Sequence, residues 1–163
     1  MGEQNGARAG GISVPDELEA GIHKDIRDYG WSGISVLGDE QGPPWTYSIG
    51  IYHSFAHPEI VIFGLSHEVI HAMIWNVVNA VKAGHHLEDG DESSDILQGY
   101  NCSFHIVDRA WYKDYFGRAL DFYGGSDFPI LQCVWPDKNG LYPWQEGFNE
   151  GLRAAQPLLF KVN

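Results

Sequence analysis

The spacing of apolar residues along the chain distinguishes the expected helices from the expected strands. Residues 15–30 place aliphatic side chains at helical intervals and end at Gly30, a residue type common at helix C-termini. Residues 66–84 carry the longest stripe with this period, and Ser66 stands where a cap for the first turn is expected. Residues 111–125 show a similar pattern, which paired glycines end. These three segments are therefore predicted to be helices.

The other apolar segments alternate with a period of two or form short continuous runs. The predicted strands cover residues 31–38, 43–53, 58–65, 100–108 and 128–136, with a short returning strand over 141–147. The continuous apolar run at 58–65 is typical of a central strand buried on both faces. Because neighbouring short strands favour antiparallel pairing, we expect a single α+β domain over residues 15–160. It should hold a mostly antiparallel sheet of about five or six strands and about two or three packed helices.

Composition narrows the class of protein. The 163 residues suit one domain with one core, and residues 1–14 are polar and glycine-rich, so we expect them to be a disordered tail. The formal net charge is −12 and no cluster of Lys or Arg is present, so nucleic acid is not an expected partner. No apolar run reaches membrane-spanning length, so no membrane partner is expected. Acidic residues concentrate in residues 85–95, which are predicted to be a solvated loop.

The two cysteines bear on the cellular compartment. Cys102 and Cys133 both fall inside apolar, strand-like segments and are predicted to be buried thiols. A reducing cytoplasm is therefore the expected location. The oligomeric state stays open at this point.

One short motif has the pattern of a metal site. His67-Glu68-Val69-Ile70-His71 matches H-E-x-x-H, in which two histidines on one helix face bind zinc and the glutamate acts as the base. A zinc-dependent hydrolase using His67, His71 and Asp91 is therefore one alternative. The motif occupies the first turn of its helix, where the backbone partial charge disfavours a cation, and no further His follows at metzincin spacing. We expect two partly buried histidines and no metal cofactor.

Several polar and aromatic residues are candidates for a ligand-binding site. They are Tyr47, His57, Glu59, Gln132, Trp135, Asp137, Trp144 and Glu146. His57 and Glu59 are two residues apart in an extended segment, so they could form a hydrogen-bonded histidine–carboxylate pair. The residues from Gln132 to Glu146 could form an aromatic-walled cleft that suits a neutral or cationic small ligand. The alternative for each is a structural role in a sheet, an edge or a turn. No nucleophile elbow, P-loop or dinucleotide fingerprint is present.

Six segments together carry a resemblance to a known family. They are GW (30–31), PPWTYSIGIY (43–52), HPEIVIFGL (57–65), FYGG (122–125), FPILQCVWPD (128–137) and PWQEG (143–147). In order and spacing they resemble the bacterial family catalogued as domain of unknown function 4262, from about Asp16 to about Leu158. The chain departs from that pattern at Ser66-His67, where the family commonly carries Pro-Pro, and at His71, where it carries a small apolar residue. The resemblance implies a small cytoplasmic bacterial domain and implies no activity.

These observations favour a cytoplasmic α+β domain that binds a small ligand or a protein partner, with catalysis not established. The first alternative is the zinc-dependent hydrolase described above. The second is a metal-free enzyme that uses the aromatic and carboxylate cleft.

Overall fold

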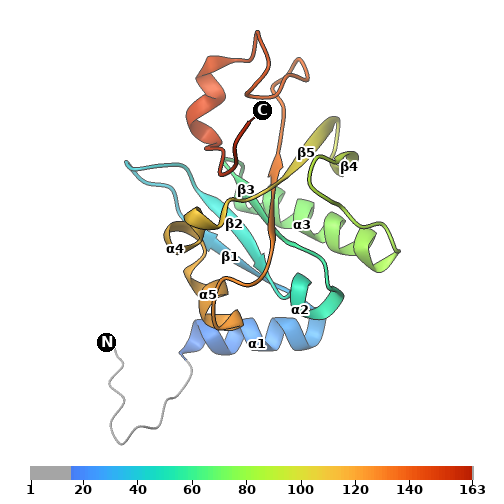
Figure 1. The fold of residues 1–163 in the computed structure, drawn as a ribbon, viewed down its shortest axis with the longest axis vertical. Coiled ribbons are helices and arrows are strands. Elements are labelled where there is room, and N and C mark those ends of the chain that lie inside the picture. Colours follow the sequence, from blue (N-terminus) through green and yellow to red (C-terminus); the bar gives the residue numbers. More distant parts are fainter. Residues whose placement is uncertain (1–15, 163) are drawn as a thin grey trace, which may run out of the picture.

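The protein folds around one sheet in the computed structural model, which describes residues 16–162 (Figure 1). The described strands are β1 (Ser32–Val36), β2 (Trp45–Ile49), β3 (Glu59–Phe63), β4 (Glu92–Leu97), β5 (Tyr100–Ile106) and β6 (Ile130–Val134). Their order across the sheet is β1-β2-β3-β6-β5-β4. The β3–β6 pair is parallel and the other pairs are antiparallel. The predicted α+β class with a mostly antiparallel sheet is confirmed.

The helices include two long ones whose ends match the sequence signals. The described helices are α1 (Glu17–Tyr29), α2 (Ile51–Phe55), α3 (His67–Lys82), α4 (Tyr112–Tyr115) and α5 (Gly117–Tyr123), with 3-10 helices η2 (Arg109–Trp111) and η3 (Glu150–Ala155). The Asp16 side chain caps α1, which ends at a left-handed Gly30. The Ser66 hydroxyl accepts a hydrogen bond from the Val69 N–H at the start of α3. Both long helices are therefore confirmed close to their predicted bounds.

The sheet lies between two helical layers, each with its own part of the core. On one face, the apolar stripe of α3 packs against Ile60 and Ile62 of β3 and against the inward-facing residues of β5 and β6. On the other face, Ile22 of α1, Tyr112 of α4 and Ala119 of α5 join Val61 and Phe63 in a second buried cluster. Successive residues of β3 therefore serve opposite layers, and every residue of this strand is buried. The predicted central strand is confirmed.

Four predictions differ from the structure. The predicted strand over 43–53 ends at Ile49, because a turn at Gly50 leads into the short helix α2. The predicted loop over 85–95 contains the start of β4, an edge strand whose exposed residues are mostly polar. The predicted helix over 111–125 is divided, since Phe116 leaves helical geometry with φ −128° and ψ 40° while its side chain is fully buried. Residues 141–147 contain no strand.

Other sequence expectations concern the termini, the membrane and the thiols. The tail expected over residues 1–14 lies outside the described residues. Among residues 16–162, no helix combines the length and apolar character needed to cross a membrane. Cys102 and Cys133 are both free and fully buried, as predicted.

Candidate ligand-binding cleft

An open cleft of about 930 Å³ lies where the β1–β2 loop, α4 and the end of η3 meet. Its volume falls in the range that small-molecule sites occupy in proteins. The loop contributes residues from Val36 to Pro43, and the sheet contributes Trp45 and Phe63. The remaining lining residues are Asp114 and Tyr115 of α4 and Ala154, Ala155 and Pro157 at the C-terminal side. Four segments distant in sequence therefore build the cleft.

Three aromatic rings form the apolar wall. The rings of Trp45 and Tyr115 are 5.1 Å apart at 70°, and the Phe63 ring contacts both of them. The indole N–H of Trp45 donates a 3.1 Å hydrogen bond to the carbonyl of Tyr115, which fixes α4 against β2. Phe63 is fully buried, whereas Trp45 and Tyr115 are partly exposed. The wall therefore combines a rigid base with accessible ring surface.

The loop that forms the opposite side is held by its own backbone. Asp39 and Gly42 form an antiparallel bridge, and the Asp39 carboxylate accepts a 2.8 Å hydrogen bond from the Gln41 N–H. This is the local turn that Asp favours through its short side chain. A Cβ atom at Gly38 would lie 2.8 Å from Pro44, so only glycine allows this close approach. The sequence around the Pro-Pro turn thus presets the loop geometry.

The C-terminal segment is attached to the sheet by two glutamines. Gln156 accepts from the Trp135 N–H at 2.8 Å and donates to its carbonyl at 3.0 Å, as a neighbouring strand would. Gln132 donates to the Pro157 carbonyl and accepts from the Leu159 N–H. Both side chains are buried. Of the predicted candidates, Gln132 and Trp135 therefore position the C-terminal wall of the cleft without lining it.

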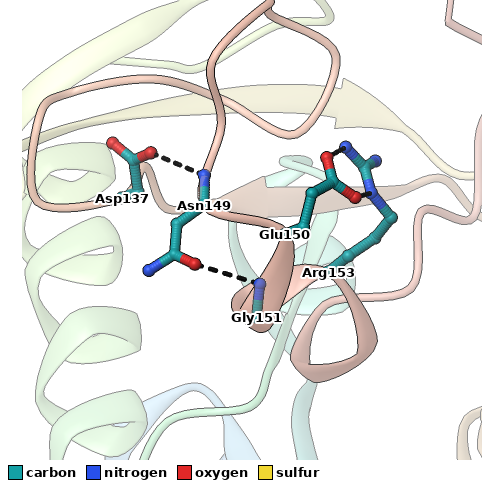
Figure 2. Close-up of polar contacts among 5 residues, drawn as sticks. All are labelled: Asp137, Asn149, Glu150, Gly151 and Arg153. Atoms are coloured by element: carbon teal, nitrogen blue, oxygen red, sulfur yellow. Dashed lines mark hydrogen bonds and ion pairs between the residues drawn. The ribbon is translucent and has the colours of Figure 1, made fainter.

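Asp137 organises the loop that leads to η3. Its carboxylate accepts hydrogen bonds from the backbone N–H groups of Asn139, Leu141 and Asn149. Figure 2 shows the Asp137–Asn149 contact beside η3, where the Asn149 side chain caps Gly151. The hydrogen bond from Leu141, followed by those from Asn149 and Asn139, holds the pKa of Asp137 below its ordinary value. The predicted candidate Asp137 therefore stabilises this loop through its backbone partners.

His57 and Glu59 have separate partners rather than the predicted mutual hydrogen bond. The His57 Nδ1–H donates to the Pro58 carbonyl at 2.9 Å, and its Nε2 accepts from the Leu87 N–H at 3.0 Å. This pattern defines a neutral ring, and burial lowers the pKa of His57. Both nitrogens are therefore occupied by backbone groups, which leaves neither for Glu59.

Glu59 is fully buried and caps the start of α2. One oxygen accepts from the N–H groups of Gly50 and Tyr52 and from the Tyr123 hydroxyl. The other oxygen accepts from the Ser48 hydroxyl at 2.6 Å and from the Ile51 N–H at 3.1 Å. Burial raises the pKa of the Glu59 carboxyl, and the hydrogen bonds it receives oppose that shift. This carboxylate explains why residues 51–55 leave the strand and form a helix.

The remaining candidates lie in three other places. Tyr47 is buried in β2, its hydroxyl accepts from the Arg118 N–H, and burial raises its pKa to about 12. The Trp144 ring stacks on Tyr142 at 5.0 Å and contacts the edge of His105. Glu146 is exposed. None of the eight ligand-binding residues predicted from sequence is among the described lining residues of the cleft.

His67 and His71 share one face of α3, as the motif predicted, but His67 is exposed and only His71 is partly buried, so the expected partial burial is wrong for His67. Their ring centroids are 5.8 Å apart, and the Ser35 hydroxyl lies 2.7 Å from Nδ1 of His67. His71 lines a smaller pocket of about 340 Å³ with Trp31 and Trp75, and burial lowers its pKa. No cluster of three or more His, Cys, Asp or Glu side chains within residues 16–162 could hold a metal ion.

Asp91, the proposed third zinc ligand, lies beyond the opposite end of α3 from His67. Its carboxylate accepts from the Glu88 N–H in the connection between α3 and β4. The sixteen residues of α3 span about 24 Å at 1.5 Å per residue. The structure therefore does not bring Asp91 to the two histidines.

The residues that line the cleft were not selected from the sequence. Trp45 stands in the recognised PPWTYSIG segment, and Asp39 and Glu40 precede its Pro-Pro turn, so a turn signal was present. Tyr115 lies 70 positions from Trp45, and no local pattern joins them. The sequence feature that could have indicated the cleft was therefore the acidic turn close to a tryptophan.

The fold is a small α+β domain with a mixed sheet between two helical layers, and an open cleft lies between the β1–β2 loop, α4 and η3. The family model described as "Domain of unknown function (DUF4262)" matches residues 25–149 of the chain, and the chain belongs to this family. No curated protein and no solved structure matches the chain significantly.

Proposed function

We propose that this domain binds a small molecule in the cleft between the β1–β2 loop, α4 and η3. The observation that carries the proposal is an open site of about 930 Å³ with a rigid aromatic wall and an internally hydrogen-bonded loop. Preformed, partly apolar concavities with a few polar groups are the usual form of small-molecule sites. Catalysis is not part of this proposal.

A fragment screen by two-dimensional NMR tests the proposal. Fragments should shift the indole N–H resonance of Trp45 and the backbone resonances of Gly42 and Ala155, which line the cleft. An Ala154→Trp variant places a large ring on the exposed lining residue and should abolish these shifts. The matched Ala72→Trp variant alters an exposed position on α3 and should preserve them. Fragment binding that maps elsewhere, or that persists in Ala154→Trp, would contradict the proposal.

A transition-metal site at His67 and His71 is the second candidate function. The favouring observation is that the two rings lie 5.8 Å apart while Ser35 contacts Nδ1 of His67. A partner on one ring nitrogen orients the other toward a metal. The test is the metal content of protein purified without a histidine tag, compared with the His67→Ala/His71→Ala variant. Near-stoichiometric zinc that the variant loses would establish this site, and zinc-free protein would remove the hydrolase alternative.

We further propose a cytoplasmic location. The support is that Cys102 and Cys133 are buried, free thiols, which a reducing compartment preserves. Labelling of denatured protein isolated from its native host with a thiol reagent should find both cysteines reduced. Recovery of oxidised cysteines from that host would contradict the location.

A further inference from the structure

The charged side chains that line the cleft are all acidic. Asp39, Glu40 and Asp114 line it, and no Lys, Arg or His is among its described lining residues. Within residues 16–162, none of these three carboxylates takes part in an ion pair. The whole chain carries a formal net charge of −12, which adds to the negative potential at the site. An anionic ligand would meet repulsion here, whereas a cation would find uncompensated carboxylates.

The aromatic wall favours the same sign of charge. The faces of Trp and Tyr rings carry negative electrostatic potential and attract ammonium groups within about 6 Å of the ring centre. Trp45 and Tyr115 are the partly exposed rings of the wall, and both stand beside lining carboxylates in the same cleft. Asp114 directly precedes Tyr115 on α4, so an acid and a ring are attached to one element. A cation in the cleft therefore meets carboxylates and ring faces together.

The rest of the lining defines the body of the ligand. Leu37 lines the cleft and is 85 % exposed. A ligand that covered its side chain would remove apolar surface from water, which is favourable. Ala154, Ala155 and Pro157 add apolar surface along the C-terminal wall. A small inorganic cation would leave this surface unused. A ligand with an ammonium group and an apolar body would cover both parts of the site.

We propose that the ligand of this cleft is a small organic cation, an amine that carries an aromatic or aliphatic body. This inference rests on the proposed function and specifies its ligand class. The ammonium group lies near Glu40 and Asp114, and the body lies against Trp45 and Tyr115. Because the hydrogen bonds of Asp39 and Trp45 already hold the loop and the wall, the site needs little rearrangement to bind.

Matched pairs of charged and neutral probes test the ligand class. The probes are 2-phenylethylamine with 2-phenylethanol and tryptamine with tryptophol, titrated at low salt against the full chain and followed at the Trp45 indole resonance. Each pair differs mainly in the charge of its head group. We expect the amines to bind about tenfold more tightly than the alcohols, a difference that shrinks as salt screens the carboxylates.

Variants assign the preference to the cleft. A Glu40→Gln/Asp114→Asn protein should lose most of the preference for amines and bind the alcohols as before. The control Glu88→Gln/Asp95→Asn removes the same number of exposed charges near β4 and should keep the preference. The chemical-shift map of each free variant should match that of the parent protein away from the substituted positions, which confirms that both variants fold.

The outcomes separate the ligand class from the proposed function. Equal binding of amines and alcohols in the cleft would overturn the cation inference and leave the cleft as a small-molecule site. An amine preference that survives Glu40→Gln/Asp114→Asn would also overturn it. If no amine, no alcohol and no member of the fragment screen perturbs the cleft, both proposals fail.

Discussion

Replacing Glu59 by Gln tests whether the buried carboxylate holds α2 in place. Gln is nearly isosteric but offers one acceptor oxygen instead of two. If its oxygen keeps the three donors on one side, its NH2 group faces the Ser48 hydroxyl and the Ile51 N–H. The hydroxyl can rotate, but the backbone N–H cannot, so at least one buried donor loses its partner.

The magnitude follows from these contacts. An unpaired buried donor costs about 1–3 kcal/mol, and hydrogen bonds to a neutral amide are each weaker than those to a carboxylate by about 1 kcal/mol. The variant also avoids the cost of burying a charge, which offsets part of the loss. We expect Glu59→Gln to lower the free energy of unfolding by about 3 kcal/mol, a large share of the roughly 5–15 kcal/mol typical of a domain.

Urea unfolding followed by tryptophan fluorescence and circular dichroism measures the difference. The control Glu146→Gln changes an exposed glutamate and should stay within about 0.5 kcal/mol of the parent protein. Amide exchange at Ile51 and Tyr52 should accelerate in Glu59→Gln alone. A loss below about 1 kcal/mol would mean that the folded protein already holds a neutral carboxyl at Glu59, and the reasoning from five donors would be refuted.

Three further changes have expected outcomes. Gly64→Ala should lower the free energy of unfolding by about 3 kcal/mol, because φ is +83° and the new Cβ would overlap a carbonyl of η3. The control Gly84→Ala, with φ +93° and open space around the new Cβ, should lower it by about 1 kcal/mol in the same urea assay. Burial lowers the pKa of His57. The unfolded chain therefore takes up a proton near pH 6.5 before the folded protein does, and stability falls as pH drops below that value. In His57→Gln, the side-chain oxygen replaces Nε2 as the acceptor for the Leu87 N–H, but the side chain no longer titrates. This variant should flatten this part of the stability-versus-pH curve, and an unchanged curve would contradict the assignment to His57. Gln156→Ala leaves the Trp135 N–H and carbonyl unpaired and should cost about 2 kcal/mol, with exchange increasing first in η3; exchange confined to other elements would argue against the attachment.

Much of the candidate site could not be predicted because its residues meet only in the folded chain. The predicted residues Gln132 and Asp137 bind backbone groups of the C-terminal segment, whereas the backbone of Trp135 pairs with the side chain of Gln156. A buried polar residue that satisfies distant backbone resembles a ligand-binding residue when only the sequence is considered. Trp45 and Tyr115 had no such polar signal, and their shared surface depends on tertiary contact.

Local patterns were sufficient for the long elements, since the period of apolar residues and the caps act over a few positions. The α1 and α3 helices and the central strand β3 follow directly from spacing, Asp16, Ser66 and Gly30. The short helix α2 instead depends on Glu59, which reaches it from the next strand across the turn. The cleft brings together segments that are even farther apart in the sequence, from Val36 to Pro157. Such contacts produce no periodic pattern in the sequence, because they join residues that are far apart along the chain.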